Sequence, residues 1–255
     1  SKPVAKRFEA LGGVLRTSTA ATGYKKKRGG GLRVMVEAHH SGEASTLDAD
    51  VILLTVGRQP RTDGLNLEAA GVVVDDQGFV PCDGAQRTNV SHIFSIGDVA
   101  GQPMLAHKAS KEGEVAAEVI AGQPSAYDVR GVPAVVFTDP EIASVGLSEA
   151  QAKAEGHNVV VGRFSFAANG RALSLNEPEG FVRLIFERDS LVLLGGEVVG
   201  PEASNLIAEV GLALEMGALA TDVGLTVHAH PTLSEAVMEA ANAAQGHAIH
   251  ALGRR

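Results

Sequence analysis

The residues best suited to chemistry lie close together in the stretch HAHPTLSEA, which begins at His228. Histidine has an unperturbed pKa of about 6.5, so it can take up a proton at physiological pH. A carboxylate that hydrogen-bonds to one ring nitrogen fixes the tautomer and stabilises the protonated ring. His230 and Glu235 fit these two roles, and Pro231 stands where the first residue of a helix would. The stretch therefore predicts a general base at His230 that Glu235 orients, while a packed or capping role stays open for both His228 and His230.

Two apolar segments that end near glycine are the next candidates for a binding site. VILLTVG, residues 51–57, is expected to be a strand buried on both faces of a mainly parallel sheet, and it ends at Gly57. HIFSIGD, residues 92–98, predicts a shorter strand before a helix that begins near Ala106. Ligands of α/β folds bind at the carboxyl ends of strands and the amino ends of helices. Asp98 could therefore accept hydrogen bonds from ligand hydroxyls, although a loop or capping aspartate would have the same spacing.

The patterns around these candidates predict an α/β part followed by an α+β part. Residues 1–13 predict an amphipathic helix, residues 24–31 an exposed basic turn, and residues 32–38 a half-buried strand. From Gly131 onward, short strands precede packed helices, which favours a separate α+β domain at residues 131–255. Its expected elements are a helix capped by Ser148 and Gln151, a strand at residues 157–166, two strands joined at residues 187–190, and helices that begin near Pro201 and Pro231.

Two apolar stripes in the last two predicted helices favour a dimer. The stripes are Leu206, Ile207, Val210 and Leu214 in one helix, and Leu233, Val237 and Ala241 in the other. One stripe can pack on the local sheet, so the second would leave apolar surface for a partner subunit to cover.

Composition limits the class of protein. The chain has 255 residues, of which 45% are hydrophobic, and its formal net charge is -8. This acidic balance argues against nucleic acid or an anionic membrane surface as a partner. A single cysteine, Cys82, excludes an internal disulfide framework and an internal redox-active cysteine pair, and it fits a reducing cytosol. No apolar run in the sequence approaches the length of a membrane span, and no metal ligand set is predicted.

Four motifs together resemble those of the dihydrolipoamide dehydrogenases, within the flavin- and NAD-dependent pyridine nucleotide-disulfide oxidoreductase family. In chain order they are IFSIGDVAGQPMLAHKASKEGEVAAEVIAG, VFTDPEIASVGLSEAQAK, FSFAANGRALSLNEPEGFVRLIF and HAHPTLSEAVMEAA. The resemblance covers essentially the whole chain and is most specific from Ile93 onward. These enzymes reoxidise the dihydrolipoyl arm of 2-oxo acid dehydrogenase complexes, so the resemblance implies an oxidoreductase.

The resemblance implies α/β remnants of two Rossmann-like nucleotide-binding domains, followed by an α+β interface domain. Residues 1–60 would be the carboxyl-terminal part of the NAD-binding domain, residues 61–130 the returning segment of the FAD-binding domain, and residues 131–255 the dimerisation domain. Gly57 would line the NAD site, and Asp98 would hold the ribityl chain of FAD. Four further residues would line the flavin: Met104, Leu105, Ala106 and His107.

The resemblance also implies partners for the base. His230 and Glu235 would serve the disulfide and the flavin of the other subunit of a homodimer. A lipoyl domain of a 2-oxo acid dehydrogenase complex would bring the dithiol to them. Electrons would pass from the dithiol to the disulfide, then to FAD and finally to NAD. Such an enzyme is expected in the cytoplasm.

Several features of that family are absent from the sequence. There is no glycine-rich turn for FAD or NAD and no Cys-x4-Cys pair, and Cys82 matches no catalytic position of the family. The first predicted helix also lacks the preceding strand that an α/β fold would supply. We interpret the chain as the carboxyl-terminal half of a longer enzyme, and we expect this chain alone to be inactive.

Two alternatives to this interpretation stay open. One is a non-catalytic dimerisation module, and the other is a related flavin disulfide reductase, such as glutathione or mercuric reductase. Glutathione reductases usually carry two adjacent glutamates after the His-Pro-Thr motif, whereas here Ala236 follows Glu235. Mercuric reductases end in a cysteine pair, whereas this sequence ends in ALGRR. Dihydrolipoamide dehydrogenase is therefore the favoured member.

Overall fold

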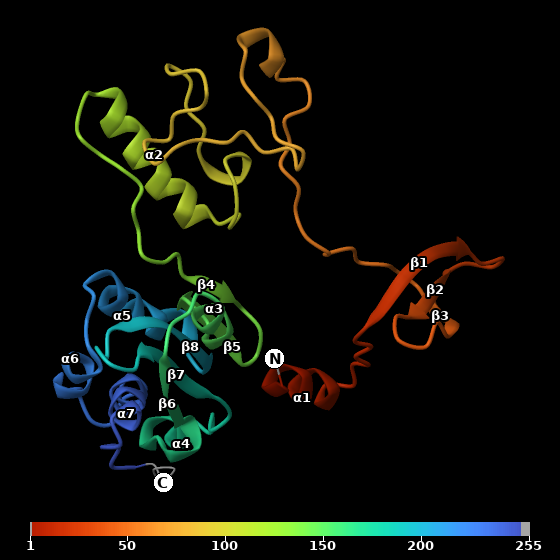
Figure 1. Ribbon diagram of the computed structural model, residues 1–255. Helices are drawn as coiled ribbons and strands as arrows, with labels where there is room; N and C mark the ends of the chain where they lie inside the picture. The colour runs from red at the N-terminus through yellow and green to blue at the C-terminus, as the bar shows by residue number, and fades with distance from the viewer. Residues whose placement is uncertain (1, 251–255) are drawn as a thin grey trace. The chain divides into compact units, whose positions relative to one another are not determined.

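The computed structural model describes residues 2–250 and contains helices and two β-sheets, which confirms the predicted mixed α/β class (Figure 1). One compact unit is Ala5–Gln59, and the rest of the described chain forms the other. Ser1, at the start of the first predicted helix, lies outside the described residues. None of the described helices combines the length and the apolar character that crossing a membrane requires.

The unit Ala5–Gln59 contains a three-stranded antiparallel sheet with the order β1-β2-β3. Its strands are β1 (Thr19–Lys26), β2 (Leu32–Ala38) and β3 (Ala44–Ala49), and α1 (Lys2–Ala10) precedes them in the chain. β2 confirms the strand predicted at residues 32–38, and its Val36 is buried. The exposed turn is shorter than predicted, because Tyr24 already pairs with Val34 as part of β1.

The segment at residues 51–57 is not the strand that the sequence predicts. It belongs to neither sheet, and Val51, Leu53 and Val56 are 79%, 84% and 87% exposed. An apolar run of this kind is stable as a buried strand only where neighbouring strands satisfy its backbone and helices cover both faces. Within the described part of its own unit, the only sheet is that of β1, β2 and β3, which does not include the segment.

The segment at residues 92–98 is not a strand either. A single antiparallel bridge pairs Phe94 with Arg87, and the chain then enters the short 3-10 helix η2 (Gly97–Val99). Ile96 keeps the extended backbone of a strand, with φ of -138° and ψ of 158°. The extended conformation that the sequence favours is therefore present, whereas a ladder of neighbouring strands is not found beside it in the described chain.

The helix predicted after this segment is confirmed as α2 (Ala106–Ile120). Gly122 ends it in the left-handed region with φ of 79°, and its N–H donates to Val119 O. A glycine at this position satisfies a free carbonyl of the last turn, as the sequence predicts. A second 3-10 helix, η1 (Leu67–Ala70), lies earlier in the same unit.

Residues from Gly131 onward form the predicted α+β arrangement around a five-stranded antiparallel sheet with the order β4-β5-β8-β7-β6. The strands are β4 (Ala134–Val136), β5 (Glu141–Gly146), β6 (Val159–Ser165), β7 (Phe181–Glu187) and β8 (Leu193–Gly200). The helices are α3 (Glu149–Ala154), η3 (Phe166–Ala168), α4 (Gly170–Ser174), α5 (Ala203–Glu215), α6 (Ala220–Leu225) and α7 (Glu235–Ala244). Ser148 and Gln151 form the predicted capping box of α3.

Two helices pack on this sheet and enclose the core. α5 packs on β5 and β8, and α7 packs on β6 and β7. Gly162 of β6 allows the close approach of α7, because a Cβ atom at this position would lie 1.9 Å from Ala240 O. Phe166, Phe186 and Leu184 are among the fully buried side chains of this core. The sheet therefore fixes the position of α7, which carries Glu235.

The apolar stripes of α5 and α7 are not exposed to a partner subunit, so the prediction that they favour a dimer was wrong. Leu206, Ile207, Val210, Leu214, Val237 and Ala241 are all buried within the domain, and Leu233 packs against the same core. Both stripes find cover because the two helices lie on different strands of one sheet. Other apolar side chains of this domain are exposed, among them Leu212, Met216, Leu225 and Val227.

Candidate functional site

The turn that precedes α7 holds His230 and Glu235 together. The helix begins at Glu235 and not at Pro231, because the turn is closed by contacts of Thr232. Thr232 N donates to Glu235 Oε2 at 2.8 Å, and Thr232 Oγ1 donates to Ala229 O at 2.7 Å. The Glu235 side chain thus binds the backbone of the turn, and His230 is held one turn farther from the helix than the sequence predicts.

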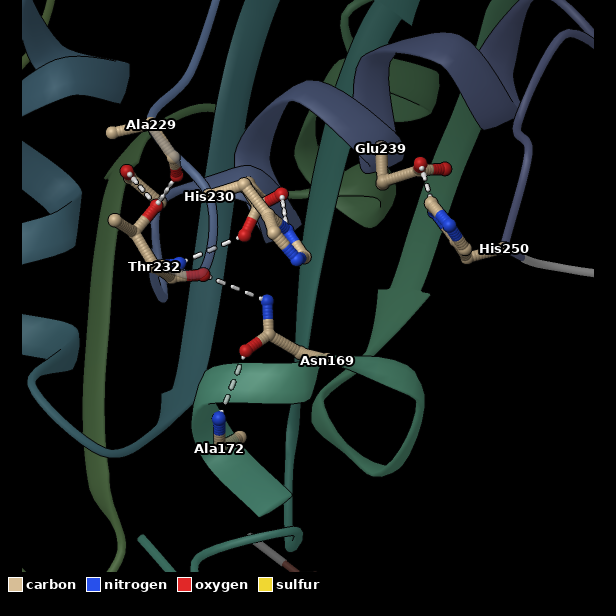
Figure 2. A network of polar contacts seen from close by, with 9 residues as sticks. Asn169, Ala172, Ala229, His230, Thr232, Glu239 and His250 are labelled. Atoms are coloured by element: carbon tan, nitrogen blue, oxygen red, sulfur yellow. Dashed lines mark hydrogen bonds and ion pairs between the residues drawn. The ribbon is translucent and has the colours of Figure 1, made fainter. Parts of the chain in front are cut away.

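His230 and Glu235 form the predicted pair (Figure 2). His230 Nδ1 lies 2.9 Å from Glu235 Oε1, as a base and its orienting carboxylate require. The side chain of His230 is 78% exposed and that of Glu235 is 18% exposed. Because Nδ1 faces the carboxylate, Nε2 is the ring nitrogen that can receive a proton from a bound molecule.

The surroundings of Glu235 favour its charged form. Burial by itself raises the pKa of Glu235, but hydrogen bonds from Thr232 N and from His230 lower it, as do the positive charges of His230 and His250 when protonated. The balance is a pKa below the ordinary value for glutamate. Glu235 is therefore an anion at neutral pH, and its Oε1 lies against Nδ1 of the His230 ring.

Asn169, which is distant in the sequence, anchors the same turn, and sequence reasoning missed it. Its side chain is buried, and its Nδ2 donates to Thr232 O at 2.9 Å. Its Oδ1 accepts from Ala172 N at 2.9 Å, so Asn169 also caps α4 (Figure 2). The capping pattern Asn-Gly-Arg-Ala was readable in the sequence, whereas the contact with a turn 63 residues away was not.

His228 has partners for both ring nitrogens. Nε2 lies 2.7 Å from Glu209 Oε1 on α5, and Nδ1 lies 2.8 Å from Thr226 O. The side chain is 6% exposed, in contrast to that of His230. These contacts support the structural alternative for His228, which ties the chain before the turn to α5.

A second pair of glutamate and histidine lies farther along α7. The buried Glu239 has its Oε1 2.8 Å from His250 Nδ1, and its Oε2 accepts from Ile249 N at 3.1 Å. Figure 2 labels both residues of this pair, and Glu239 lies on α7, the helix that begins at Glu235. Glu239 thus fixes the residues that follow α7, a role that the sequence analysis did not assign.

The residues expected at the flavin lie between η2 and the first turn of α2. Asp98 is an exposed residue of η2, and Met104 is buried. Leu105 is the N-cap of α2, and Ala106 is its first residue. His107 lies in the first turn, with its Nε2 2.7 Å from Pro133 O. Gly57, expected at NAD, belongs to the other compact unit, where it is exposed and has φ of 134°.

Comparison with known proteins identifies the family. Residues 1–113 match the family model described as pyridine nucleotide-disulphide oxidoreductase, and residues 132–241 match that of its dimerisation domain. The chain belongs to the pyridine nucleotide-disulphide oxidoreductase family. The resemblance drawn from the motifs is thereby confirmed.

Individual relatives agree with this assignment. The dihydrolipoyl dehydrogenase of Halobacterium salinarum is 52% identical over 100% of this chain and 53% of its own length. That of Geobacillus stearothermophilus is 51% identical over 97% of this chain and 52% of its own length. The crystal structure of LpdA from Mycobacterium tuberculosis is 29% identical, with a TM-score of 0.83 over 94% of this chain and 51% of that chain. The chain therefore spans about half the length of these relatives.

Cys82 does not have the surroundings of a reactive thiol. It is partly buried, and its Sγ lies 3.4 Å from Gln86 Oε1. Burial raises the pKa of Cys82, and the negative charge of Glu112 raises it further. Reactive cysteines instead have a lowered pKa, because the thiolate is the nucleophile. Among residues 2–250, no three potential ligands from His, Cys, Asp and Glu are grouped to hold a metal ion.

Proposed function

We propose that this chain is part of a dihydrolipoyl dehydrogenase and supplies the proton acceptor for its dithiol substrate. The observation that supports this most strongly is the exposed His230 ring, whose Nδ1 lies 2.9 Å from the largely buried Glu235 carboxylate. Relatives about 50% identical are named dihydrolipoyl dehydrogenase. The substrate would be a dihydrolipoyl group on the lipoyl domain of a 2-oxo acid dehydrogenase complex.

The chemistry assigned to His230 follows from the needs of dithiol oxidation. The thiolate attacks a disulfide, whereas the thiol is a poor nucleophile. His230 Nε2 removes the thiol proton, and Glu235 stabilises the resulting imidazolium through Nδ1. Asn169 and Thr232 keep the turn in place, so the base does not reorient when it gains charge. The disulfide that is attacked belongs to another part of the protein, because this chain has one cysteine.

The proposed cofactors are FAD and NAD, which when bound carry the electrons from the reduced disulfide to the final acceptor. The described residues fit FAD, because the first turn of α2 has no acidic side chain and its N-cap makes no side-chain hydrogen bond. Such a helix start leaves N–H groups for a phosphate or a polar ring edge. Asp98 would bind ribityl hydroxyls, and residues 104–107 would line the ring. Gly57 would allow close approach of NAD.

The proposed domains are a carboxyl-terminal part of an NAD-binding domain at residues 1–60, a returning FAD segment at residues 61–130 and an interface domain at residues 131–255. The match of residues 132–241 to a dimerisation domain supports a homodimer. In that dimer His230 would serve the disulfide and flavin of the other subunit, and the enzyme would act in the cytoplasm. The exposed side chains Leu212, Met216, Leu225 and Val227 would then find cover at the interface.

The proposal is tested by purifying the whole protein that carries this chain in parallel with residues 1–255 alone. We expect the whole protein to absorb in the blue region, as a bound flavin does, and to reduce NAD with dihydrolipoamide. The chain alone should give no turnover above the buffer blank, because Cys82 has no second thiol to pair with. Turnover by the chain alone would contradict the proposal. A colourless, inactive whole protein would favour the non-catalytic dimerisation module.

A further inference from the structure

α2 carries an ion pair in which both partners are buried. Lys108 Nζ lies 2.8 Å from Glu112 Oε1, and both side chains are 5% exposed. Taking two charges out of water is costly, and apolar replacements of buried ion pairs are often as stable as the pair or more so. A contribution to the stability of the fold therefore does not explain this buried ion pair. Its remaining contacts indicate a different role.

The remaining contacts of the pair go to the backbone of one turn. Glu112 Oε2 accepts from Gly97 N at 2.7 Å. Lys108 Nζ donates to Gly97 O at 3.3 Å and to Gly101 O at 3.1 Å. Asp98 lies between these bonded groups, so the pair holds the backbone on both sides of it. Hydrogen bonds with a charged partner are roughly twice as strong as neutral ones, which makes this a firm clamp.

The neighbours of the pair do not replace its charges. Burial raises the pKa of Cys82 and that of Tyr127, and the charge of Glu112 raises both further. Both groups are therefore neutral at physiological pH. Lys108 remains the counter-charge of Glu112, and removing one of the two would leave the other buried without compensation.

We propose that Lys108 and Glu112 are positioning residues that hold the Asp98 turn in the geometry that binds FAD. The inference rests on the proposed function, in which Asp98 binds the ribityl chain. Lys108 and Glu112 do not touch the cofactor in this account. They act through Gly97 and Gly101, whose backbone groups they bind on either side of Asp98 in the chain.

The test uses the whole protein with Lys108→Met and Glu112→Met combined, which removes both charges and keeps long apolar side chains. The matched control is Lys111→Met with Glu114→Met, because Lys111 and Glu114 form an exposed ion pair on the same helix, 52% and 63% exposed. After removal of flavin, a fluorescence titration gives the Kd for FAD, and the Tm of the apoprotein reports stability. Glu112→Gln is a second variant, which keeps an acceptor for Gly97 N without the charge.

We expect the buried double variant to bind FAD about 10- to 100-fold more weakly, by analogy with the range typical for residues that support metal ligands. Its apoprotein Tm should stay at or above that of the wild type. The surface double variant should keep the wild-type Kd within twofold, and Glu112→Gln, which leaves Lys108 buried without its counter-charge, should lower the apoprotein Tm as well as the affinity for FAD.

Two results with the buried double variant would overturn the inference alone. One is an unchanged Kd for FAD, and the other is a loss of affinity that follows a fall in Tm, including failure to fold. The first result would mean that the pair does not support Asp98, and the second that the role of the pair is only structural. A wild-type whole protein that does not bind FAD would instead refute the proposed function, and the inference with it. Hydrogen exchange at residues 97–101, slower in the wild type than in the double variant, checks the clamp independently of FAD.

Discussion

The His230 turn and the apolar segment at residues 51–57 differ in where their partners lie. The turn is held within its own domain, where Asn169 and Glu235 bond to the backbone of Thr232 and Glu235 also bonds to the His230 ring. The segment 51–57 has the composition of a buried strand and yet is exposed, outside both sheets. Polar contacts within one domain are enough to hold the His230 turn, whereas an apolar segment becomes a buried strand only where neighbouring strands and helices cover it.

The largest expected effect is on the domain that holds the turn. Gly162→Ala places a Cβ atom 1.9 Å from Ala240 O, so α7 must move away from β6. We expect a loss of about 3 kcal/mol in the free energy of unfolding, the upper end of the usual cost of overpacking. Urea denaturation of residues 1–255, followed by circular dichroism, measures it.

Gly211→Ala on α5 is the control, because its added Cβ meets no atom within 4 Å. That change should stabilise the helix by about 0.5–1 kcal/mol. Equal destabilisation by both substitutions would show that the close contact between α7 and β6 does not support the site.

A smaller effect is expected where the turn meets α4. Asn169→Ala removes the cap of α4 and leaves Thr232 O without its donor. We expect a cost of about 2 kcal/mol, combining a lost cap with a buried acceptor that has lost its partner. Asn169→Ser keeps a capping oxygen but cannot reach Thr232, so it separates the two contributions. If serine restored full stability, the contact with the His230 turn would contribute nothing.

The smallest effect on the stability of residues 1–255 is expected in the segment 51–57. Leu53 is 84% exposed, so Leu53→Ala should change the unfolding free energy of residues 1–255 by less than about 0.5 kcal/mol. In the whole protein the same change should cost about 2–5 kcal/mol, if the segment is there the buried strand of an NAD-binding domain. The core substitution Leu184→Ala should be costly in both proteins. An equal, small effect of Leu53→Ala in both would contradict the proposed domain.

The parts of the fold that could be predicted are those that depend on nearby residues. The alternating strand at residues 32–38, the capping box of Ser148 and Gln151, and the glycine stop at Gly122 all satisfy their backbone locally, and all are confirmed. The segments 51–57 and 92–98 were predicted as strands because apolar composition indicates burial. Composition does not specify the neighbouring strands that such burial needs.

The same limit applies to the candidate site. The pairing of His230 with Glu235 spans five residues, so spacing and residue type predicted it. Asn169 reaches the turn across 63 residues, and His228 reaches Glu209 across 19, so neither contact is visible in a local pattern. The start of α7 was misplaced for a related reason, because Thr232 N bonds to the Glu235 carboxylate and closes a turn before the helix.

The proposed role of His230 as the acceptor of the dithiol proton is best checked with His230→Gln in the whole protein. Glutamine keeps polar groups of similar length but cannot accept that proton. Stopped-flow absorbance should show flavin reduction by dihydrolipoamide slowed by about 10² to 10⁴, the usual contribution of a general base, with reduction by NADH nearly unchanged. His228→Gln, the control, should affect the dithiol reaction less. Equal slowing of both half-reactions by His230→Gln would contradict the claim, since it would mean a structural role for this histidine.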